Sequence, residues 1–357
     1  MAAVLLLNLL LILPIPNNDR LNANPIELSP EMKQFLDENV ERGLPPLQRL
    51  NSLVKAVFQN EKLKFSYVPE SRTAMETFRN RSGNCLSFTL LFISMARHMD
   101  LDARFHEVEI PPLFSKKGSF IVLSQHLNSI VFIEGKTYLV DLFPEVVPFD
   151  IGGRIVPDNR GFSHFFNNIG VSELSRGDYV QADRYLKKAI ETDPSAISPL
   201  INLGVARSRA GKLDEAEKYY REALKLDRKN LTVLNNLAVI CELTGRTEEF
   251  HRLQKKVEEF RDKNPYYHYN LGLQAYQQDD FETALAQYEK AIKLKSEDHN
   301  FYFALARVYA KTGHMKKAMD KMQLAEKYAS DPQKKFMYSQ KYELLKSKRF
   351  QSADRDN

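Results

Sequence analysis

The sequence predicts an α+β domain followed by an all-α solenoid, and three observations support this fold class. The chain has 357 residues, which is enough for about two domains. Residues 26–160 begin with helix-type patterns and continue with strand-type patterns. Residues 163–332 show a repeated pattern of constant period. Because helices followed by strands form an α+β fold and helical repeats stack on their neighbours, we expect two different domains.

The elements of the first domain follow from local signals. Ser29 caps a helix and Pro30 suits its first position, so a helix is predicted at 30–42. Two strands are predicted to meet at the turn 134–136. A linker is predicted at 154–161, with the pair Gly152-Gly153 before it read as a turn. The full set of predicted elements is helices at 30–42, 47–58 and 85–99 and strands at 101–110, 119–133 and 137–143.

Composition and charge are those of a soluble globular protein. Hydrophobic residues make up 43% and charged residues 27% of the chain, which argues against a disordered, fibrous or polytopic membrane protein. Lys and Arg total 51 against 46 Asp and Glu, and the two signs are mixed, so no nucleic-acid partner is expected. The two cysteines, Cys85 and Cys241, fall in different predicted domains and are expected to be lone thiols.

The amino terminus carries an apolar leader at residues 1–25. Residues 2–15 are apolar except for Asn8 and Pro14, which is too short a run to span a bilayer. The run fits the core of a secretory signal, although no Lys or Arg precedes it and no clear cleavage site follows. One interpretation is an exported protein, periplasmic or secreted, whose mature chain has no transmembrane span. The other is a buried or partner-bound terminal segment of a cytoplasmic protein.

The second domain repeats every 34 residues. Four positions recur at this spacing, and each forms a column of equivalent residues. The first column is Gly or Ala, the second is Gly or Asp at the predicted turn, and the other two are mostly Ala. Small residues let two antiparallel helices approach closely, and glycine permits the tight turn between them. The four columns are Gly170, Gly204, Ala238, Gly272 and Ala306; Gly177, Gly211, Gly245, Asp279 and Gly313; Ala182, Ala216, Phe250, Ala284 and Ala318; and Ala189, Ala223, Val257, Ala291 and Ala325.

This pattern resembles the tetratricopeptide repeat family across residues 163–332. Five repeats are predicted, at 163–196, 197–230, 231–264, 265–298 and 299–332. The third is degenerate, because Phe250 replaces a small residue and Gln254 replaces an aromatic residue or Leu. A capping helix is predicted at 333–350, with Phe336, Tyr342 and Leu345 toward the stack. The resemblance implies a concave surface that binds a protein or peptide partner.

One column of the repeats is a candidate peptide-binding site. An asparagine stands two residues before the small residue in four repeats, at Asn168, Asn202, Asn236 and Asn270. Each amide both donates and accepts, so a column of them can hydrogen-bond an extended peptide backbone. The alternative interpretation is a packing feature of ordinary repeats.

The first domain contains a candidate nucleophile, Cys85. It follows Gly83-Asn84 at the predicted start of a helix, where the helix amino terminus stabilises a thiolate. His126 lies 41 residues later and Asp141 a further 15, on the two strands of the predicted hairpin. If Ile133 faces Lys136, Asn128 faces Asp141, and His126 is then a diagonal neighbour of Asp141. The alternative interpretation is that Cys85 is a small buried apolar residue.

These motifs resemble the transglutaminase-like branch of the papain-type cysteine enzymes. The resemblance is carried by Gly83-Asn84-Cys85 with its helix, and by the hairpin from His126 to Tyr138-Leu139-Val140-Asp141. It implies that Cys85 is the nucleophile, His126 the base and Asp141 the group that orients the base. Asn128 and Tyr138 stand where the family often has aromatic residues, usually Trp.

Two functions remain open from the sequence. The first is a thiol-dependent amide hydrolase or acyltransferase whose repeats bind a protein or peptide. The second is a non-catalytic adaptor with a relic transglutaminase-like domain. The backbone N–H of Cys85 is an expected oxyanion donor, and Asn84 and Gln125 are further candidates. No metal-ligand spacing and no phosphate-binding loop is present, so no cofactor is expected.

Overall fold

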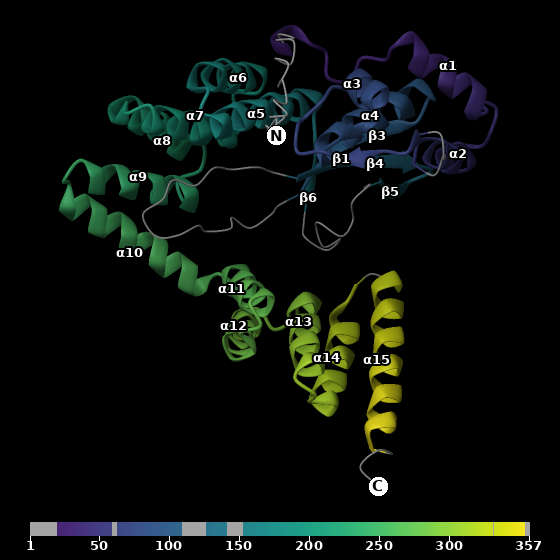
Figure 1. Ribbon diagram of the computed structural model, residues 1–357, viewed down its shortest axis with the longest axis vertical. Helices are drawn as coiled ribbons and strands as arrows, with labels where there is room; N and C mark the ends of the chain where they lie inside the picture. The colour runs from purple at the N-terminus through teal and green to yellow at the C-terminus, as the bar shows by residue number, and fades with distance from the viewer. Residues whose placement is uncertain (1–19, 59–62, 109–125, 141–152, 331, 354–357) are drawn as a thin grey trace, which may run out of the picture. The chain divides into compact units, whose positions relative to one another are not determined.

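The computed structural model describes residues 20–58, 63–108, 126–140, 153–330 and 332–353 (Figure 1). The described residues form two compact units. The first unit extends to Pro199 and the second begins at Leu200, so the division falls within helix α7. The predicted leader lies outside the described residues, apart from 20–25.

The first unit contains the predicted helices and strands together with several short elements. Helices α1, α2 and α4 and strands β3, β4 and β5 correspond to the six predicted elements, with ends that differ by a few residues where they are described. Helix α3 and strands β1, β2 and β6 were not predicted. The elements are η1 (Arg20–Asn22), α1 (Pro30–Asn39), α2 (Pro46–Phe58), β1 (Ser66–Tyr67), α3 (Ala74–Asn80), β2 (Ser82–Gly83), α4 (Cys85–His98), β3 (Asp102–Val108), β4 (His126–Ile133), β5 (Lys136–Val140), β6 (Gly153–Val156), α5 (Asp158–Arg176) and α6 (Tyr179–Thr192).

A four-stranded antiparallel sheet forms the centre of this unit, in the order β5-β4-β3-β6. Ile133 pairs with Lys136, which is the register predicted for the hairpin. One face of the sheet is apolar and lies in the same core as α4, whose side chains from Leu86 to Ala96 are all buried. The sheet residues in this core include Ala103, Phe105, Leu127, Val131 and Ile133. This packing fixes the position of α4, and therefore of Cys85 at its first residue, relative to the strands (Figure 1).

The predicted linker at 154–161 is wrong, because these residues belong to regular structure. Strand β6 pairs with β3, and α5 begins at Asp158. Gly153, predicted in a turn, is the first residue of β6, where a Cβ atom would lie 2.4 Å from the ring of His106. A Cβ on Gly161 would lie 2.8 Å from the ring of Phe105. These glycines therefore serve close packing between elements, so the first repeat packs directly onto the sheet.

Five helix pairs follow in the chain, as the 34-residue period predicts. The first pair, α5 and α6, belongs to the first unit. The remaining pairs are α7 (Ile197–Arg209) with α8 (Leu213–Leu226), α9 (Leu231–Leu243) with α10 (Thr247–Lys263), α11 (Pro265–Gln277) with α12 (Phe281–Leu294), and α13 (His299–Lys311) with α14 (Met315–Tyr328). An α+β unit followed by an all-α repeat array confirms the predicted fold class.

The small residues of the repeat make room for a large side chain on the second helix of the pair. A Cβ atom on Gly204 would lie 2.4 Å from the ring of Tyr220, and one on Gly272 would lie 2.6 Å from the ring of Tyr288. The predicted turn position adopts the left-handed conformation, with a φ of 78° at Gly211 and 57° at Asp279. The columns read from the sequence thus correspond to helix contacts and to turns.

Helix α15 (Pro332–Ala353) follows the last pair, where a capping helix was predicted. Leu345 is buried and Tyr342 is half-buried, as expected. The placement of Phe336 toward the stack is wrong, because its side chain is 65% exposed. Nine residues separate Phe336 from Leu345, which puts them on opposite faces of a helix with 3.6 residues per turn. Tyr338 is the buried aromatic residue instead.

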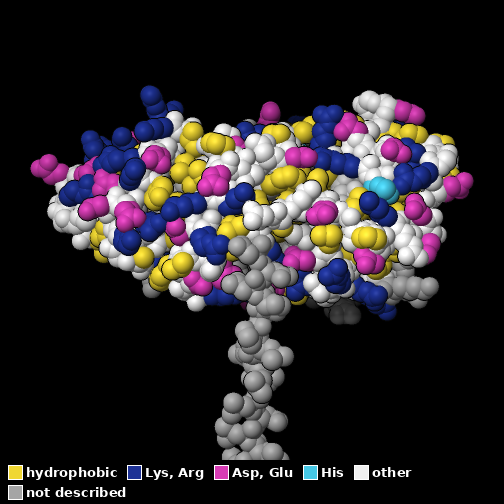
Figure 2. All heavy atoms as spheres, turned by 90° about the horizontal axis from the view of Figure 1, so that it is seen from above, with side chains coloured by type: hydrophobic (Ala, Val, Ile, Leu, Met, Phe, Trp, Pro, Cys, Tyr) yellow, Lys and Arg dark blue, Asp and Glu magenta, His cyan; other side chains and the backbone are white. Residues whose placement is uncertain are grey.

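The surface seen in Figure 2 carries basic and acidic side chains that are interspersed, with scattered apolar side chains between them. This agrees with the near balance of charges in the sequence. Within the described part of the chain, no helix combines the length and the apolar character that crossing a bilayer requires.

Candidate functional site

Cys85 is the first residue of α4 and its side chain is partly exposed. The helix begins here because Asn84 caps it: Oδ1 of Asn84 accepts hydrogen bonds from the backbone N–H of Ser87 at 3.0 Å and from its hydroxyl at 2.9 Å. The thiol therefore lies at the positive end of the helix dipole, as the sequence predicts for a nucleophile.

The amide of Asn84 is fully engaged in holding this turn. Its Nδ2 donates to the hydroxyl of Ser71 at 2.8 Å and to the carbonyl of Pro69 at 3.2 Å. Both ends of the side chain are thus bonded within the protein, so the hypothesis that Asn84 is an oxyanion donor is not supported. Gln125, the other candidate, lies outside the described residues.

One hydroxyl connects Cys85 to the strand that begins with His126. Oγ1 of Thr89 lies 3.0 Å from the carbonyl oxygen of Cys85 and 3.0 Å from that of Leu127, so its single hydrogen is shared between these two acceptors. His126 is the first residue of β4, where its backbone pairs with Val108. The structure therefore brings the first turn of α4 next to the start of β4.

The other members of the predicted triad are described only in part. The structure describes the backbone of His126 but not its side chain. Asp141 lies outside the described residues. It directly follows Val140, the last described residue of β5, which pairs with Ser129 on β4. The three roles of Cys85, His126 and Asp141 stay predictions.

Two other histidines near α4 are bonded elsewhere. Nε2 of His98, at the last residue of the helix, lies 2.7 Å from the guanidinium of Arg42. Nδ1 of His106, on β3, lies 2.8 Å from Oδ1 of Asn128. Because each imidazole has a partner away from Cys85, neither competes for the thiol in this arrangement.

Tyr67 is a residue near Cys85 that sequence reasoning missed. It lies on β1, opposite Gly83 on β2, and is 55% exposed. Burial raises the pKa of the Tyr67 phenol, and the charge of Cys85 raises it further. Strand β1 has two residues, so no periodic pattern in the sequence could have indicated it.

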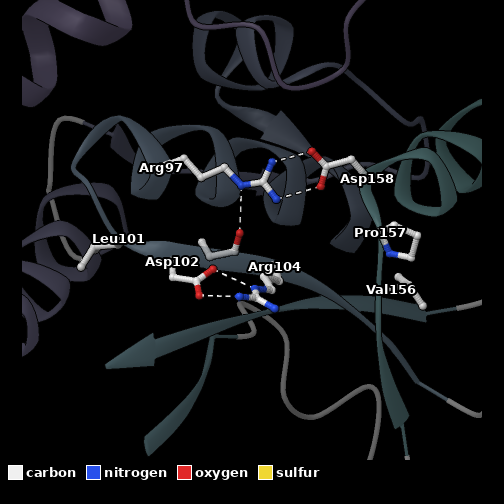
Figure 3. A pocket seen from close by; sticks show the side chains of 8 residues that line it. Arg97, Leu101, Asp102, Arg104, Val156, Pro157 and Asp158 are labelled. Carbon is white, nitrogen blue, oxygen red and sulfur yellow. Dashed lines mark hydrogen bonds and ion pairs between the residues drawn. The ribbon is translucent and has the colours of Figure 1, made fainter. Parts of the chain in front are cut away.

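A pocket lies at the other end of α4, beside Arg97 and strand β3 (Figure 3). Its charged side chains are paired with each other: Arg97 binds Asp158 through both terminal nitrogens at 2.6 and 2.8 Å, and Arg104 binds Asp102 at 2.7 Å. Because Arg97 is three turns of helix away from Cys85, this pocket is separate from the candidate nucleophile.

The predicted peptide-binding amides differ in exposure. Asn202 and Asn236 have no exposed surface, whereas Asn168 and Asn270 are half-buried. Asn236 and Ser208 lie beside the hydroxyl of Tyr220, and both act against the rise in its pKa that burial causes. The central amides therefore do not line an open surface in this structure, and the binding role of the column stays a prediction.

The second cysteine, Cys241, is buried on α9 with 1% of its surface exposed. Burial raises the pKa of this thiol, and the carboxylate of Glu249 raises it further. These surroundings suppress thiolate formation, so Cys241 is a natural internal control for the reactivity of Cys85. In the part of the chain that is described, no group of three His, Cys, Asp or Glu side chains is placed to hold a metal ion.

Comparison with protein families identifies both parts of the chain. Residues 33–125 match the transglutaminase-like superfamily. Residues 164–229 and 201–261 each match a tetratricopeptide repeat model, and residues 272–313 match a TPR repeat model. The transglutaminase-like match contains Cys85 but ends before His126 and Asp141. No curated protein matches the sequence.

Solved structures that match include MamA proteins and a pilF protein. A crystal structure of MamA is 20% identical, covers 46% of this chain and 91% of its own, and has a TM-score of 0.27. MamA from Desulfovibrio magneticus RS-1 is 19% identical, with coverages of 48% and 96% and a TM-score of 0.28. The Pseudomonas aeruginosa pilF structure is 22% identical, with coverages of 56% and 90% and a TM-score of 0.28. No functional conclusion follows from similarities of this size. From the family matches, the chain combines a transglutaminase-like domain at residues 33–125 with tetratricopeptide repeats between residues 164 and 313.

Proposed function

We propose that this protein is a thiol-dependent amide hydrolase or acyltransferase of transglutaminase-like type, whose repeats bind a protein or peptide partner. The observation that carries the proposal is the hydroxyl of Thr89. By bonding the backbone carbonyls of Cys85 and Leu127, it holds the first turn of α4, which begins with the partly exposed Cys85, next to the strand that begins with His126. A nucleophile at a helix amino terminus beside a histidine-bearing strand is the arrangement that thiol catalysis requires.

In the proposed reaction, the thiolate of Cys85 attacks the carbonyl carbon of an amide, and the electron pair of the C=O bond moves onto oxygen. The backbone N–H of Cys85 is the expected donor to this oxyanion. The C–N bond then breaks, His126 gives its proton to the leaving amine, and a thioester remains on sulfur. Water, or the amine of a lysine, attacks the thioester, loses a proton to His126 and releases the thiol. Asp141 orients the imidazole throughout.

Water is the favoured acceptor of the two. Transfer to an amine requires a site that excludes water from the thioester, whereas hydrolysis requires no such exclusion. Cys85 is partly exposed. We therefore assign hydrolysis as the main reaction, with protein binding by the repeats supplying the substrate.

One observation favours the adaptor as the second candidate. Asn128 stands where the resemblance leads one to expect an aromatic residue, and its side-chain oxygen is bonded to His106. Asn128 lies on β4, the strand that begins with His126, and its contact with His106 on β3 is a structural polar contact that requires no catalysis. In an adaptor, the first domain would be a relic and the repeats alone would act.

Alkylation of the thiol separates these two functions. The full-length protein is treated with iodoacetamide at pH 7, and the modification of Cys85 and of Cys241 is followed by mass spectrometry. For an enzyme, Cys85 reacts at least about tenfold faster than Cys241, and His126→Ala removes most of that advantage, because the histidine assists thiolate formation. His98→Ala, at the far end of the same helix, is the matched control and leaves the rate unchanged. If His126→Ala also leaves the rate of Cys85 unchanged, the catalytic proposal fails and the adaptor is favoured.

A further inference from the structure

The first helices of the last two repeats carry almost no negative charge. Helix α11 contains no Asp, Glu, Lys or Arg, and α13 contains Arg307 and Lys311 but no acidic residue. The segment 332–347 of α15 has four lysines and one carboxylate, Glu343. The second helices carry both signs of charge: α12 has Glu282 and Glu289 with two lysines, and α14 has Asp320 and Glu326 with four lysines. Basic side chains therefore outnumber acidic ones on α13, on α14 and on the described part of α15, and of these helices only α13 has no acidic residue at all.

Two of these cations lie on aromatic rings of neighbouring first helices. The guanidinium of Arg307 lies 4.7 Å from the ring centre of Tyr276 on α11. The ammonium of Lys341 on α15 lies 4.7 Å from the ring centre of Phe303 on α13. Phe303 and Arg307 are four residues apart, so they share one face of α13. We call Tyr276, Phe303, Arg307 and Lys341 the basic strip; it joins α11, α13 and α15.

Phe303, one member of the basic strip, is held in place by contacts with buried side chains. The ring of Phe303 packs against that of Tyr338, with ring centres 5.2 Å apart. The hydroxyl of Tyr338 lies 2.7 Å from Nδ1 of His299, and both residues are buried. The ring of Phe303 therefore provides a fixed support, and a cation on such a support loses less conformational freedom when it binds a ligand.

Both cations are available for a ligand. Arg307 is exposed and Lys341 is partly exposed. In the described chain, no carboxylate forms an ion pair with either of them, whereas nearby Lys295 is paired with Asp298 at 3.0 Å. Within the described chain, the positive charges of Arg307 and Lys341 are therefore not neutralised by an ion pair.

We propose that the basic strip binds an acidic segment of a protein partner. This inference rests on the proposed partner binding by the repeats and names the chemistry of the partner. Carboxylates from Asp or Glu side chains match the guanidinium of Arg307 and the ammonium of Lys341. A single-stranded nucleic acid is less well matched, because bases stack on open aromatic faces, and one face of Tyr276 and one of Phe303 are already covered by the cations.

Fluorescence anisotropy of a labelled decapeptide of alternating Glu and Ala tests the proposal on the full chain. The peptide should bind, and Arg307→Glu combined with Lys341→Glu should weaken binding at least tenfold. Lys316→Glu combined with Lys321→Glu is the matched control, because it makes the same change of charge on α14; it should weaken binding less than threefold. The same peptide with Gln in place of Glu should bind at least tenfold more weakly than the acidic peptide.

Several outcomes would overturn the basic strip as the site. They are no binding of the acidic peptide, equal weakening by the two double variants, equal binding of the Gln peptide, or tighter binding of a uridine decanucleotide. If the Glu variant does not fold, as judged by circular dichroism, Arg307→Gln with Lys341→Gln replaces it and should weaken binding at least threefold. Alkylation of Cys85 should be the same in all these variants, so failure of this proposal is distinguished from failure of the proposed catalysis.

Discussion

The imidazole of His164 lies 2.7 Å from the carboxylate of Glu107, and both side chains are buried. Glu107 is on β3 and His164 is on α5, so this contact joins the sheet to the first repeat helix. Arg154 on β6 binds the second oxygen of Glu107 at 2.8 Å. The first repeat is thereby fastened to the sheet by a buried polar network as well as by apolar packing.

Replacing Glu107 with Gln should lower stability in a pH-dependent way. Burial by itself raises the pKa of Glu107, but the hydrogen bond and charge of His164, together with Arg154, outweigh it and lower the pKa to about 2. Because the folded pKa lies below the ordinary value of 4.5, the carboxylate stabilises the fold above about pH 4.5, and this contribution declines as the pH falls toward 2. We expect a loss of about 1–3 kcal/mol at pH 7.

Thermal unfolding at pH 7 and pH 3 measures this effect. The difference in Tm between the wild-type protein and Glu107→Gln should be largest at pH 7 and smaller at pH 3. Glu38→Gln, at an exposed position on α1, is the control and should shift Tm little at either pH. A Tm difference for Glu107→Gln that is the same at both pH values would contradict this account.

The junction between the domains shows where sequence reasoning stops. Glu107 and His164 are 57 residues apart, and neither stands in a local pattern that indicates a partner. Gly153 and Gly161 resemble turn residues in the sequence, yet each allows an aromatic ring to approach the backbone. Long-range contacts of this kind leave no periodic signal, so a packed junction was mistaken for a linker.

Local sequence signals did predict the start of α4, the repeats and part of the candidate site. Asn84 before Cys85 indicated a capped helix start, and the structure confirms that Asn84 caps α4. The repeats were predictable because the small residue and the turn residue recur at fixed offsets. Thr89 could not be recognised, because its role depends on the carbonyl of Leu127, which is 38 residues away.

The cap of α4 should be required both for stability and for the reactivity of the candidate nucleophile. Asn84→Ala removes the acceptor for Ser87 and the contact with Ser71, so we expect a loss of about 1–2 kcal/mol. The alkylation rate of Cys85 should fall as well, because the first turn of the helix frays. Asn84→Asp keeps the acceptor and should retain most of the stability. Asn80→Ala, an exposed position on α3, serves as the control. A stable Asn84→Ala variant with unchanged Cys85 alkylation would show that the cap is not required for stability or for the reactivity of Cys85.

The buried amide of Asn236 can be tested for a packing role. Asn236→Ala leaves the buried hydroxyl of Tyr220 with one polar neighbour fewer, and we expect a loss of about 1–2 kcal/mol by urea unfolding. If the hydroxyl is the reason, Asn236→Ala should cost less in a Tyr220→Phe background than in the wild-type protein. Asn270→Ala, at the same repeat position and half-buried, should cost less. Unchanged stability together with weaker binding of a peptide partner would instead favour the ligand-binding interpretation of the asparagine column.

A size relationship between the two helices of a repeat holds in the second to fifth repeats, whereas the first pairs Gly170 with Leu186. The small residue of the first helix is Gly where the residue 16 positions later is Tyr220 or Tyr288. The small residue is Ala in the third and fifth repeats, where the residue 16 positions later is Gln254 or Met322. A Cβ atom on Gly204 would lie 2.4 Å from the ring of Tyr220, so the larger ring requires the smaller partner. The fifth repeat shows a working alternative, because Ala306 and Met322 are both buried in one core.

Gly204→Ala should therefore destabilise the protein, and adding Tyr220→Met should reduce that destabilisation. We expect Gly204→Ala alone to cost about 1–3 kcal/mol in urea unfolding, since the added methyl group overpacks the helix pair. Combined with Tyr220→Met, which copies the fifth repeat, it should cost less than the sum of the two single changes, because the unbranched Met side chain can move aside. Gly43→Ala is the control, since its Cβ would meet only one atom, at 3.9 Å. Additive costs in the double variant would show that the ring of Tyr220 is not what requires glycine at position 204.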